Sequence, residues 1–280
     1  MKNTIVNVDM EKNRKVNLHY LLWTGGWDST YRLLELLLIE GKRVQPVYVI
    51  DSDRGSVAFE LRAMQKIKID LHDNHPAARK LLLPTMFIEL NDIKSNTAIT
   101  EAYNRLLLRQ PALGTQNEWL ARLTYQYNLS DLEMAVQKSP GPMFSALIKV
   151  LEKKDSNGQS KLKVKEELKG LDEYIFFKNF SFPLTEITKM EMLEKSKKEG
   201  FFNLMNQTWF CHHPLRSGKP CGVCVPCISV MKEGMGFRMT WYGRIRYHFR
   251  LFLSKDQFQK AYPETHKVMR KIKKNLMSKK

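Results

Sequence analysis

The sequence is poor in the features that mark secreted and membrane proteins. Only four of its 280 residues are cysteines, and none precedes residue 211, which excludes the disulfide framework of small secreted domains. No apolar run approaches the roughly 20 residues that a membrane-spanning helix needs. Segment 1–16, an N-terminal extension, lacks the apolar stretch of a signal peptide. Since 43% of the residues are hydrophobic, the chain can bury a core. We therefore expect a folded cytoplasmic protein without a membrane partner.

Acidic residues are also few. The chain has 29 acidic and 46 basic residues, which leaves a formal net charge of +17. Segment 238–280 contains thirteen basic and two acidic residues, so it holds +11 of this charge. Such an excess is typical of proteins that bind nucleotides, nucleic acid or acidic proteins.

The apolar pattern of the first half predicts an α/β fold. Short apolar runs predict three buried strands, at 16–23, 43–50 and 85–90. Helical spacing is found in four segments, 31–41, 56–71, 99–109 and 117–127. The alternation of strands and helices predicts a parallel sheet that is covered by helices on both faces.

The second half is predicted to complete this domain. Strands are expected at 134–137 and 174–177, and helices at 144–151 and 186–198. Segment 153–171 is polar and lysine-rich, and we interpret it as a solvated hairpin or insertion rather than a binding segment.

The strongest local motif is TGGWDST, residues 24–30, between the first strand and the first helix. Its two glycines let backbone amides approach an anion closely, and Thr24, Ser29 and Thr30 add hydroxyl donors at a helix N-terminus. It differs from the GxxxxGK[ST] loop, which brings a lysine to the phosphates. The motif favours phosphate binding. The alternative is a tight turn in which Asp28 caps the helix.

The cysteines form a C-x9-C-x2-C-x2-C pattern made by Cys211, Cys221, Cys224 and Cys227. Thiolates at this spacing suit tetrahedral Zn²⁺ better than an iron–sulfur cluster. The pattern uses every thiol and leaves no open coordination position, so we expect a structural site. The neighbouring residues 212–213 are histidines and alternative ligands, although we expect them to be ordinary loop residues.

Together these motifs resemble a known family. TGGWDST is similar to the SGGxDS loop of the PP-loop ATP pyrophosphatases, with Thr24 in place of the usual serine. A PP-loop combined with a late four-cysteine motif resembles the 7-cyano-7-deazaguanine synthases (QueC-like). The family's PL-x4-K-x-E segment is similar to residues 182–192. Its approach to the first zinc cysteine is similar to residues 208–211, and its PGRN segment to residues 114–117.

The resemblance implies an adenine-nucleotide α-hydrolase-like (HUP) domain and a defined reaction. Such an enzyme uses ATP and Mg²⁺ to adenylate the carboxylate of 7-carboxy-7-deazaguanine, releasing pyrophosphate. Ammonia then gives an amide, and a second activation gives the nitrile. The implied catalytic residues are Asp28, Ser29 and Lys189; without the resemblance, Lys189 is equally well an ordinary exposed lysine. The implied ATP-binding residues are Thr24, Gly25, Gly26, Asp28, Ser29, Thr30, Ile50, Asp51 and Gly114.

Two segments depart from the family. Thr115 stands where PGRN has its arginine, and KSPGPMF at 138–144 replaces the family's substrate loop. These departures favour ATP activation over nitrile formation. They leave a protein amine as an alternative to ammonia, as in relatives from antiviral operons that join the base to a protein. The other function classes are a PP-loop enzyme that modifies tRNA and a non-catalytic ATP-binding module.

The expected organisation is an ATP-binding α/β domain at 17–205, a zinc-binding subdomain at 206–236 and a basic aromatic extension at 237–280. In the extension, arginines alternate with aromatic residues over 241–252. We expect this segment to be a helix that packs on the core or docks a protein, with nucleic-acid binding or a homodimer as alternatives. The residues expected to pack are Trp241, Ile245, Phe249 and Phe252.

Overall fold

The computed structural model describes residues 18–252, except 111–113, 115, 141 and 157–158, and also residues 257 and 260. The N-terminal extension 1–16, Thr115 and most of the basic segment beyond 252 lie outside the described residues.

Five parallel strands form the central sheet, in the order β3-β2-β1-β4-β7. The strands are β1 (Leu18–Leu22), β2 (Arg43–Ile50), β3 (Met86–Glu89), β4 (Leu132–Glu133) and β7 (Phe180–Ser181). Parallel neighbours need crossover connections, and helices supply them here. The prediction of an α/β fold with a parallel sheet is confirmed, and the architecture is compatible with a Rossmann-like fold.

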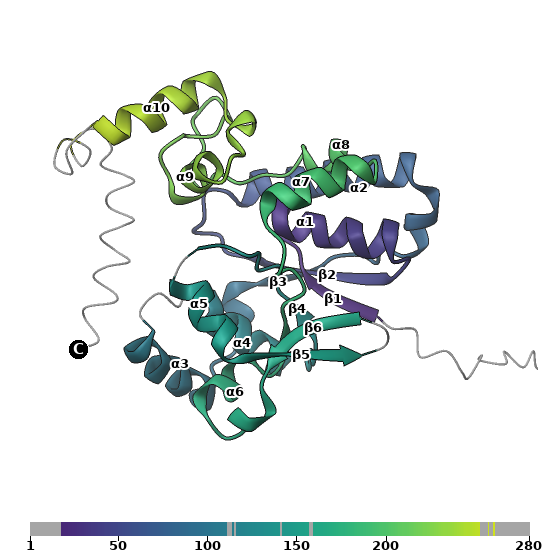
Figure 1. Ribbon diagram of the computed structural model, residues 1–280, viewed down its shortest axis with the longest axis vertical. Coiled ribbons are helices and arrows are strands. Elements are labelled where there is room, and N and C mark those ends of the chain that lie inside the picture. Colours follow the sequence, from purple (N-terminus) through teal and green to yellow (C-terminus); the bar gives the residue numbers. More distant parts are fainter. Residues whose placement is uncertain are drawn as a thin grey trace, which may run out of the picture.

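Helices cover both faces of this sheet (Figure 1). One face bears α1 (Trp27–Leu34) with its π-helical continuation η1 (Glu35–Ile39), α2 (Val57–Asn74), α7 (Lys189–Lys198) and α8 (Phe202–Met205). The other bears α3 (Thr97–Arg109), α4 (Gln116–Gln126), α5 (Pro142–Lys149) and α6 (Asp172–Phe177). Short 3-10 turns are η2 (Pro76–Lys80), η3 (Leu90–Asp92), η4 (Glu166–Leu168) and η5 (Gly236–Arg238).

Strand β1 explains why the molecule has two hydrophobic cores. Its side chains alternate, so Leu21 packs among the residues of α1, α2 and α7, whereas Tyr20 and Leu22 pack with those of α3, α4 and α6. The first core continues into the four cysteines. The cysteine segment therefore belongs to the same packed body as the sheet, and α9 (Val225–Lys232) and α10 (Trp241–Phe252) extend it at one end (Figure 1).

Two predicted strands are wrong. Residues 134–137 follow β4 instead of forming a strand, since the ladder ends at Glu133. Residues 174–177 lie in α6, and the last strand is β7. The aromatic run at 174–177 has strand-like composition, but Asp172 opens a helical turn there and pairs with Arg105 and Arg109 of α3. Tertiary contacts therefore override the local preference.

The lysine-rich segment is a hairpin, but part of it is buried. Strands β5 (Leu151–Ser156) and β6 (Gln159–Val164) pair antiparallel, as the hairpin interpretation predicted. Lys161 is only 5% exposed, and its Nζ lies 2.6 Å from Glu133 Oε1 beneath the sheet. The expectation of a fully solvated insertion is therefore wrong, because a buried carboxylate requires a charged partner.

The expected packing of α10 is also wrong. The four residues expected to pack on the core are between 53% and 84% exposed; they are Trp241, Ile245, Phe249 and Phe252. The buried residue of this helix is Gly243. Among the described residues, no helix is both long enough and apolar enough to cross a membrane.

Candidate functional site

The loop between β1 and α1 has a conformation that depends on glycine. Gly25 has a φ of 66°, and a Cβ at this position would lie 2.9 Å from the carbonyl oxygen of Glu60 in α2. The Gly25 carbonyl accepts a hydrogen bond of 2.9 Å from the Trp209 N–H. The loop is thus held between α2 and the segment that leads to the first cysteine, where a larger residue would not fit.

The start of α1 leaves its amides available. Gly26 is the N-cap residue, and no side chain of the described residues caps the helix, so Asp28 does not have the capping role considered above. Ser29 Oγ accepts a hydrogen bond of 3.3 Å from the Thr24 N–H and lies 3.4 Å from Thr24 Oγ1. The loop therefore presents two hydroxyls beside the positive end of a helix, which suits an anion.

A cavity of about 430 Å³ opens beside this loop. It lies past the carboxyl ends of the central strands, where open α/β sheets bind their ligands. Its wall combines residues from the loop and α1, from the end of β2 and the start of α2, from α4, from the segment after β4, from α7 and from the cysteine segment. The loop and α7 contribute five of the predicted site residues to it, namely Thr24, Gly26, Asp28, Ser29 and Lys189.

Asp28 and Lys189 face each other in this cavity. Lys189 Nζ lies 3.8 Å from Asp28 Oδ2 and 2.8 Å from Glu233 Oε2. Asp28 Oδ1 is buried and has no hydrogen-bond partner within the described residues. Burial raises the pKa of Asp28 to about 6, although the Lys189 ammonium opposes the shift. Near neutral pH this carboxylate is an ionised acceptor in need of a cation.

Lys189 is positioned by the first turn of α7. Thr188 is the N-cap residue of this helix, and its side chain forms a reciprocal capping box with Glu191. Glu191, which matches the acidic residue of the family segment, thus stabilises the helix end. The lysine next to the cap is held at the cavity wall, and its side chain is only 16% exposed.

Sequence reasoning missed Arg238, which also lines the cavity. Its guanidinium lies 4.8 Å from the ring centroid of Trp27 and 4.9 Å from that of Phe210, and it donates to the Thr208 carbonyl at 2.7 Å. Burial lowers its pKa to about 10, so it stays cationic at neutral pH. Only its place in a basic, aromatic-rich segment hinted at this role.

A second charged group lines the opposite part of the cavity. Glu60 accepts hydrogen bonds from Tyr48 (2.8 Å), Ser56 (2.7 Å) and Arg54 (2.8 Å). These residues come from β2 and the start of α2, so the topology fixes them together. Arg54, Glu60 and His212 face the cavity, and burial lowers the pKa of His212, which favours its neutral form.

The remaining predicted ATP-binding residues lie elsewhere. Thr30 is fully buried, and its Oγ1 accepts a hydrogen bond of 3.0 Å from Trp23 Nε1. The residue of β2 that lines the cavity is Val49. The next two residues, Ile50 and Asp51, do not line the cavity. Thus the structure brings the loop and Lys189 together, but not these three residues.

Gly114 lines a second, mostly apolar pocket of about 170 Å³ between α3, α5 and α6. The two cavities share three wall residues, Gln116, Met134 and Val136. The polar residues of the second pocket include Gln110, Asn117 and Glu173. This arrangement offers space for an organic group beside the cavity that the 24–30 loop lines.

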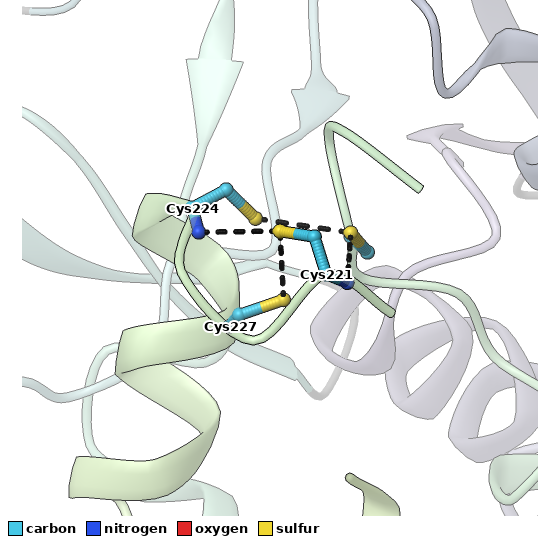
Figure 2. A group of neighbouring side chains, drawn as sticks. Cys221, Cys224 and Cys227 are labelled. Atoms are coloured by element: carbon cyan, nitrogen blue, oxygen red, sulfur yellow. Dashed lines mark hydrogen bonds between the residues drawn. The ribbon is translucent and has the colours of Figure 1, made fainter. Parts of the chain in front are cut away.

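The four cysteines form one buried cluster, seen in Figure 2. Their Sγ atoms all lie within 4.8 Å of one another, and two pairs, Cys211–Cys224 and Cys221–Cys227, are 3.9 Å apart. Four sulfurs at the Zn–S distance of about 2.3 Å would stand about 3.8 Å apart in a tetrahedron. The cluster could therefore hold a metal ion such as zinc.

Backbone N–H groups donate hydrogen bonds to the Cys221 sulfur in particular. The Cys221 Sγ accepts from the Val223 N–H (3.4 Å) and the Cys224 N–H (3.3 Å). Hydrogen bonds from the neighbouring thiols, above all Cys211, together with the Val223 N–H lower the pKa of Cys221, whereas hydrogen bonds within the cluster raise the pKa of Cys211 and Cys227. His212 lies outside the four-residue cluster and faces the cavity instead.

The cysteine cluster also shapes the cavity wall. Cys224 is the N-cap residue of α9, whose residues Val225, Pro226, Ser229 and Val230 line the cavity. On the other side, Trp209 Nε1 donates to the Cys211 carbonyl at 2.7 Å, and the Trp209 ring is a further wall residue. The cysteine cluster and the cavity wall are therefore built from the same segment of the chain.

No protein-family model matches this chain, and no curated protein sequence matches it. The resemblance to the deazaguanine synthases therefore rests on the motifs alone.

Proposed function

We propose that this chain is a PP-loop enzyme that uses ATP to activate a carboxylate as an acyl adenylate. The observation that carries the proposal is the meeting of the 24–29 loop, Asp28 and Lys189 in one cavity. A loop of backbone amides and hydroxyls, a carboxylate with one oxygen left without a hydrogen-bond partner, and a lysine form a suitable set for a triphosphate and its metal ion.

In the proposed site, the loop, Asp28 and Lys189 have separate roles that follow from their charges. The loop amides with Thr24 and Ser29 bind the β and γ phosphates. The unpartnered Oδ1 of Asp28 fits an oxygen-preferring cation, so Asp28 would hold Mg²⁺, which would neutralise phosphate charge when bound. Lys189 offsets the remaining negative charge between the phosphates and the incoming carboxylate. The protein thereby brings two anions together in one orientation.

The reaction converts a poor leaving group into a good one. A carboxylate oxygen attacks the α phosphorus of ATP, and pyrophosphate leaves. An amine then attacks the acyl carbon, AMP leaves, and the amine loses a proton to give an amide. The proposed acid is 7-carboxy-7-deazaguanine or a close analogue, and the adjoining apolar pocket supports an acyl group of heteroaromatic size.

The amine is ammonia or a protein amine. With ammonia, a second activation of the amide would yield the nitrile. With a protein amine, the product would be a deazaguanine–protein conjugate. The altered segments at Thr115 and 138–144 support amide formation or conjugation as strongly as nitrile synthesis.

We further propose that the four cysteines bind zinc in a structural role, since four thiolates leave no position for a substrate. All four thiols of the sequence lie in this cluster. Sulfur transfer to tRNA is disfavoured because it would need a further thiol or an iron–sulfur cluster.

The test is to incubate the purified chain with ATP, Mg²⁺, 7-carboxy-7-deazaguanine and ammonia and to identify products by mass spectrometry. AMP that appears only with the acid, together with amide or nitrile, would support the proposal. A bound adenylate without amide would support activation with another amine as acceptor. No AMP with this acid would refute the deazaguanine assignment, and no ATP binding would refute the site itself.

A further inference from the structure

Helix α10 is attached to the body through one side. A Cβ on Gly222 would lie 2.2 Å from the Gly243 carbonyl oxygen, so the helix backbone rests directly on the cysteine segment. Arg250 Nη1 donates to the Val223 carbonyl at 3.0 Å on the same side. The helix is held close to the metal-binding cluster and lies at the opposite end of the molecule from α3 and α6 (Figure 1).

The other side of α10 bears an apolar stripe without a partner in the described structure. Trp241, Ile245, Phe249 and Phe252 are 73%, 55%, 53% and 84% exposed. Their spacing of four, four and three residues puts them on one helix face. At about 100° per residue, Gly243 lies on nearly the opposite face. The stripe therefore points away from the protein to which the helix is attached.

The charge around the stripe has one sign. Arg244 and Arg246 flank it, and α10 contains no acidic residue. In the sequence, segment 253–280 adds nine basic and two acidic residues. A second copy of the chain would bring an equally cationic surface, so self-association through this face is opposed by repulsion.

We propose that α10 is an amphipathic anchor that lies on an anionic phospholipid surface, with the stripe among the acyl chains and the arginines at the headgroups. Exposed Trp and Phe beside arginine are the composition of helices that lie in a membrane interface. A basic segment next to such a helix adds attraction to anionic lipid.

Lipid fits the stripe better than nucleic acid does. Ile245 in the stripe and Leu251, which lies beside the stripe and is 62% exposed, are aliphatic and have no flat face on which a base could stack. A phosphate-rich strand would satisfy the arginines but would leave these side chains in water. A bilayer interface offers phosphate headgroups to the arginines and acyl chains to the aliphatic side chains. This role is independent of the proposed carboxylate activation.

The experiment is flotation of the full chain with vesicles of equal parts phosphatidylcholine and phosphatidylglycerol, and with phosphatidylcholine alone. We expect binding to the anionic vesicles that weakens with salt. Ile245→Glu combined with Phe249→Glu should lower the partition coefficient at least about tenfold, since it places two charges in the inserted face. Leu108→Glu is the matched control, because Leu108 is 77% exposed on distant α3, and it should bind as the unaltered chain does.

Three results would overturn the proposal. The first is no binding to the anionic vesicles. The second is equal binding by the double variant, which would mean that the basic segment alone is sufficient. The third is stripe-dependent binding to a single-stranded RNA oligonucleotide, or stripe-dependent dimerisation, without vesicle binding. The stripe is already exposed, so the double variant should keep an unchanged melting temperature, which verifies its fold.

Discussion

Lys189 and Asp28 are 161 residues apart in the sequence, yet Nζ of the lysine lies 3.8 Å from Oδ2 of the aspartate. The lysine is also in contact with Glu233 at 2.8 Å. One cation is thus shared by two carboxylates in a cavity whose loop favours anions. Such a lysine can shift toward a phosphate when a metal ion occupies the aspartate, which makes the pair the first target for mutation.

Lys189→Met should lower AMP formation by about a hundredfold or more, since a charge that stabilises phosphate at the cavity wall is removed. Lys189→Arg should restore part of the rate. The control is Lys198→Met on the same helix, where the side chain is exposed and the rate should stay unchanged. Equal rates for the unaltered chain and Lys189→Met would remove this lysine from the mechanism.

Asp28→Asn should abolish metal-dependent ATP binding but stabilise the ligand-free protein. The folded-state pKa of Asp28 is raised from 3.8 to about 6, so the fold loses stability as pH rises through this interval. The Asp28 side chain is 28% exposed, so water in the cavity reduces the free-energy cost of ionising it in the folded state. We expect the amide variant to be about 1–2 kcal/mol more stable near pH 8 and equally stable near pH 4. Urea unfolding at both pH values measures this, and a destabilised variant near pH 8 would contradict it.

Metal removal should disable the cavity as well as the cysteine cluster. Cys224 caps α9, and Trp209 hydrogen-bonds to the Cys211 carbonyl, so loss of the ion would loosen two cavity walls. We expect a strong chelator to lower the melting temperature and weaken ATP binding by about tenfold or more, with recovery on adding Zn²⁺. Elemental analysis and calorimetry provide the readouts. Unchanged ATP affinity in the metal-free protein would show that the two sites are uncoupled.

Glu133 is the centre of a buried ionic network, and Glu133→Gln should destabilise the fold by about 3 kcal/mol or more. Its carboxylate contacts Arg32 (2.7 Å), His19 (2.9 Å) and Lys161 (2.6 Å) and is fully buried. The solvent-facing pair of Lys154 on the hairpin and Glu166 in η4 offers a control, and Glu166→Gln should leave the free energy of unfolding nearly unchanged.

The same network predicts acid sensitivity. Burial would raise the pKa of Glu133, but the hydrogen bond from His19 and the ion pairs with Arg32 and Lys161 outweigh it and hold this pKa below its usual range. Its contribution to stability is therefore complete above the ordinary glutamate pKa near 4.5 and declines as pH falls below it. Unfolding curves of Glu133→Gln should depend less on pH in the acidic range. An identical acid dependence in both proteins would exclude this carboxylate as the cause.

Local patterns were enough for most of the first half of the fold. Strand β2 occupies the predicted residues 43–50, because the apolar run 46–50, rich in β-branched residues, leaves few alternatives. The glycines and hydroxyls of 24–30 likewise marked the loop, and the thiol spacing marked the cluster. Each of these signals lies within a short stretch of chain, where sterics and hydrogen bonding dominate.

Long-range contacts decided the rest. The apolar runs at 134–137 and 174–177 were compatible with strands in isolation, but the first lines the cavity and the second packs as a helix on α3. Arg238 became a cavity residue only because Trp27 and Phe210 enclose it.

By itself, then, the sequence determined the parallel α/β architecture, the glycine-dependent loop before α1 and the grouping of the four thiols, since periodicity and short-range geometry encode them. Only the tertiary structure decided which charges meet in the cavity, which lysine of the hairpin is buried and which face of α10 stays in water. These outcomes depend on desolvation and pairing between distant side chains, and no local pattern reports those energies.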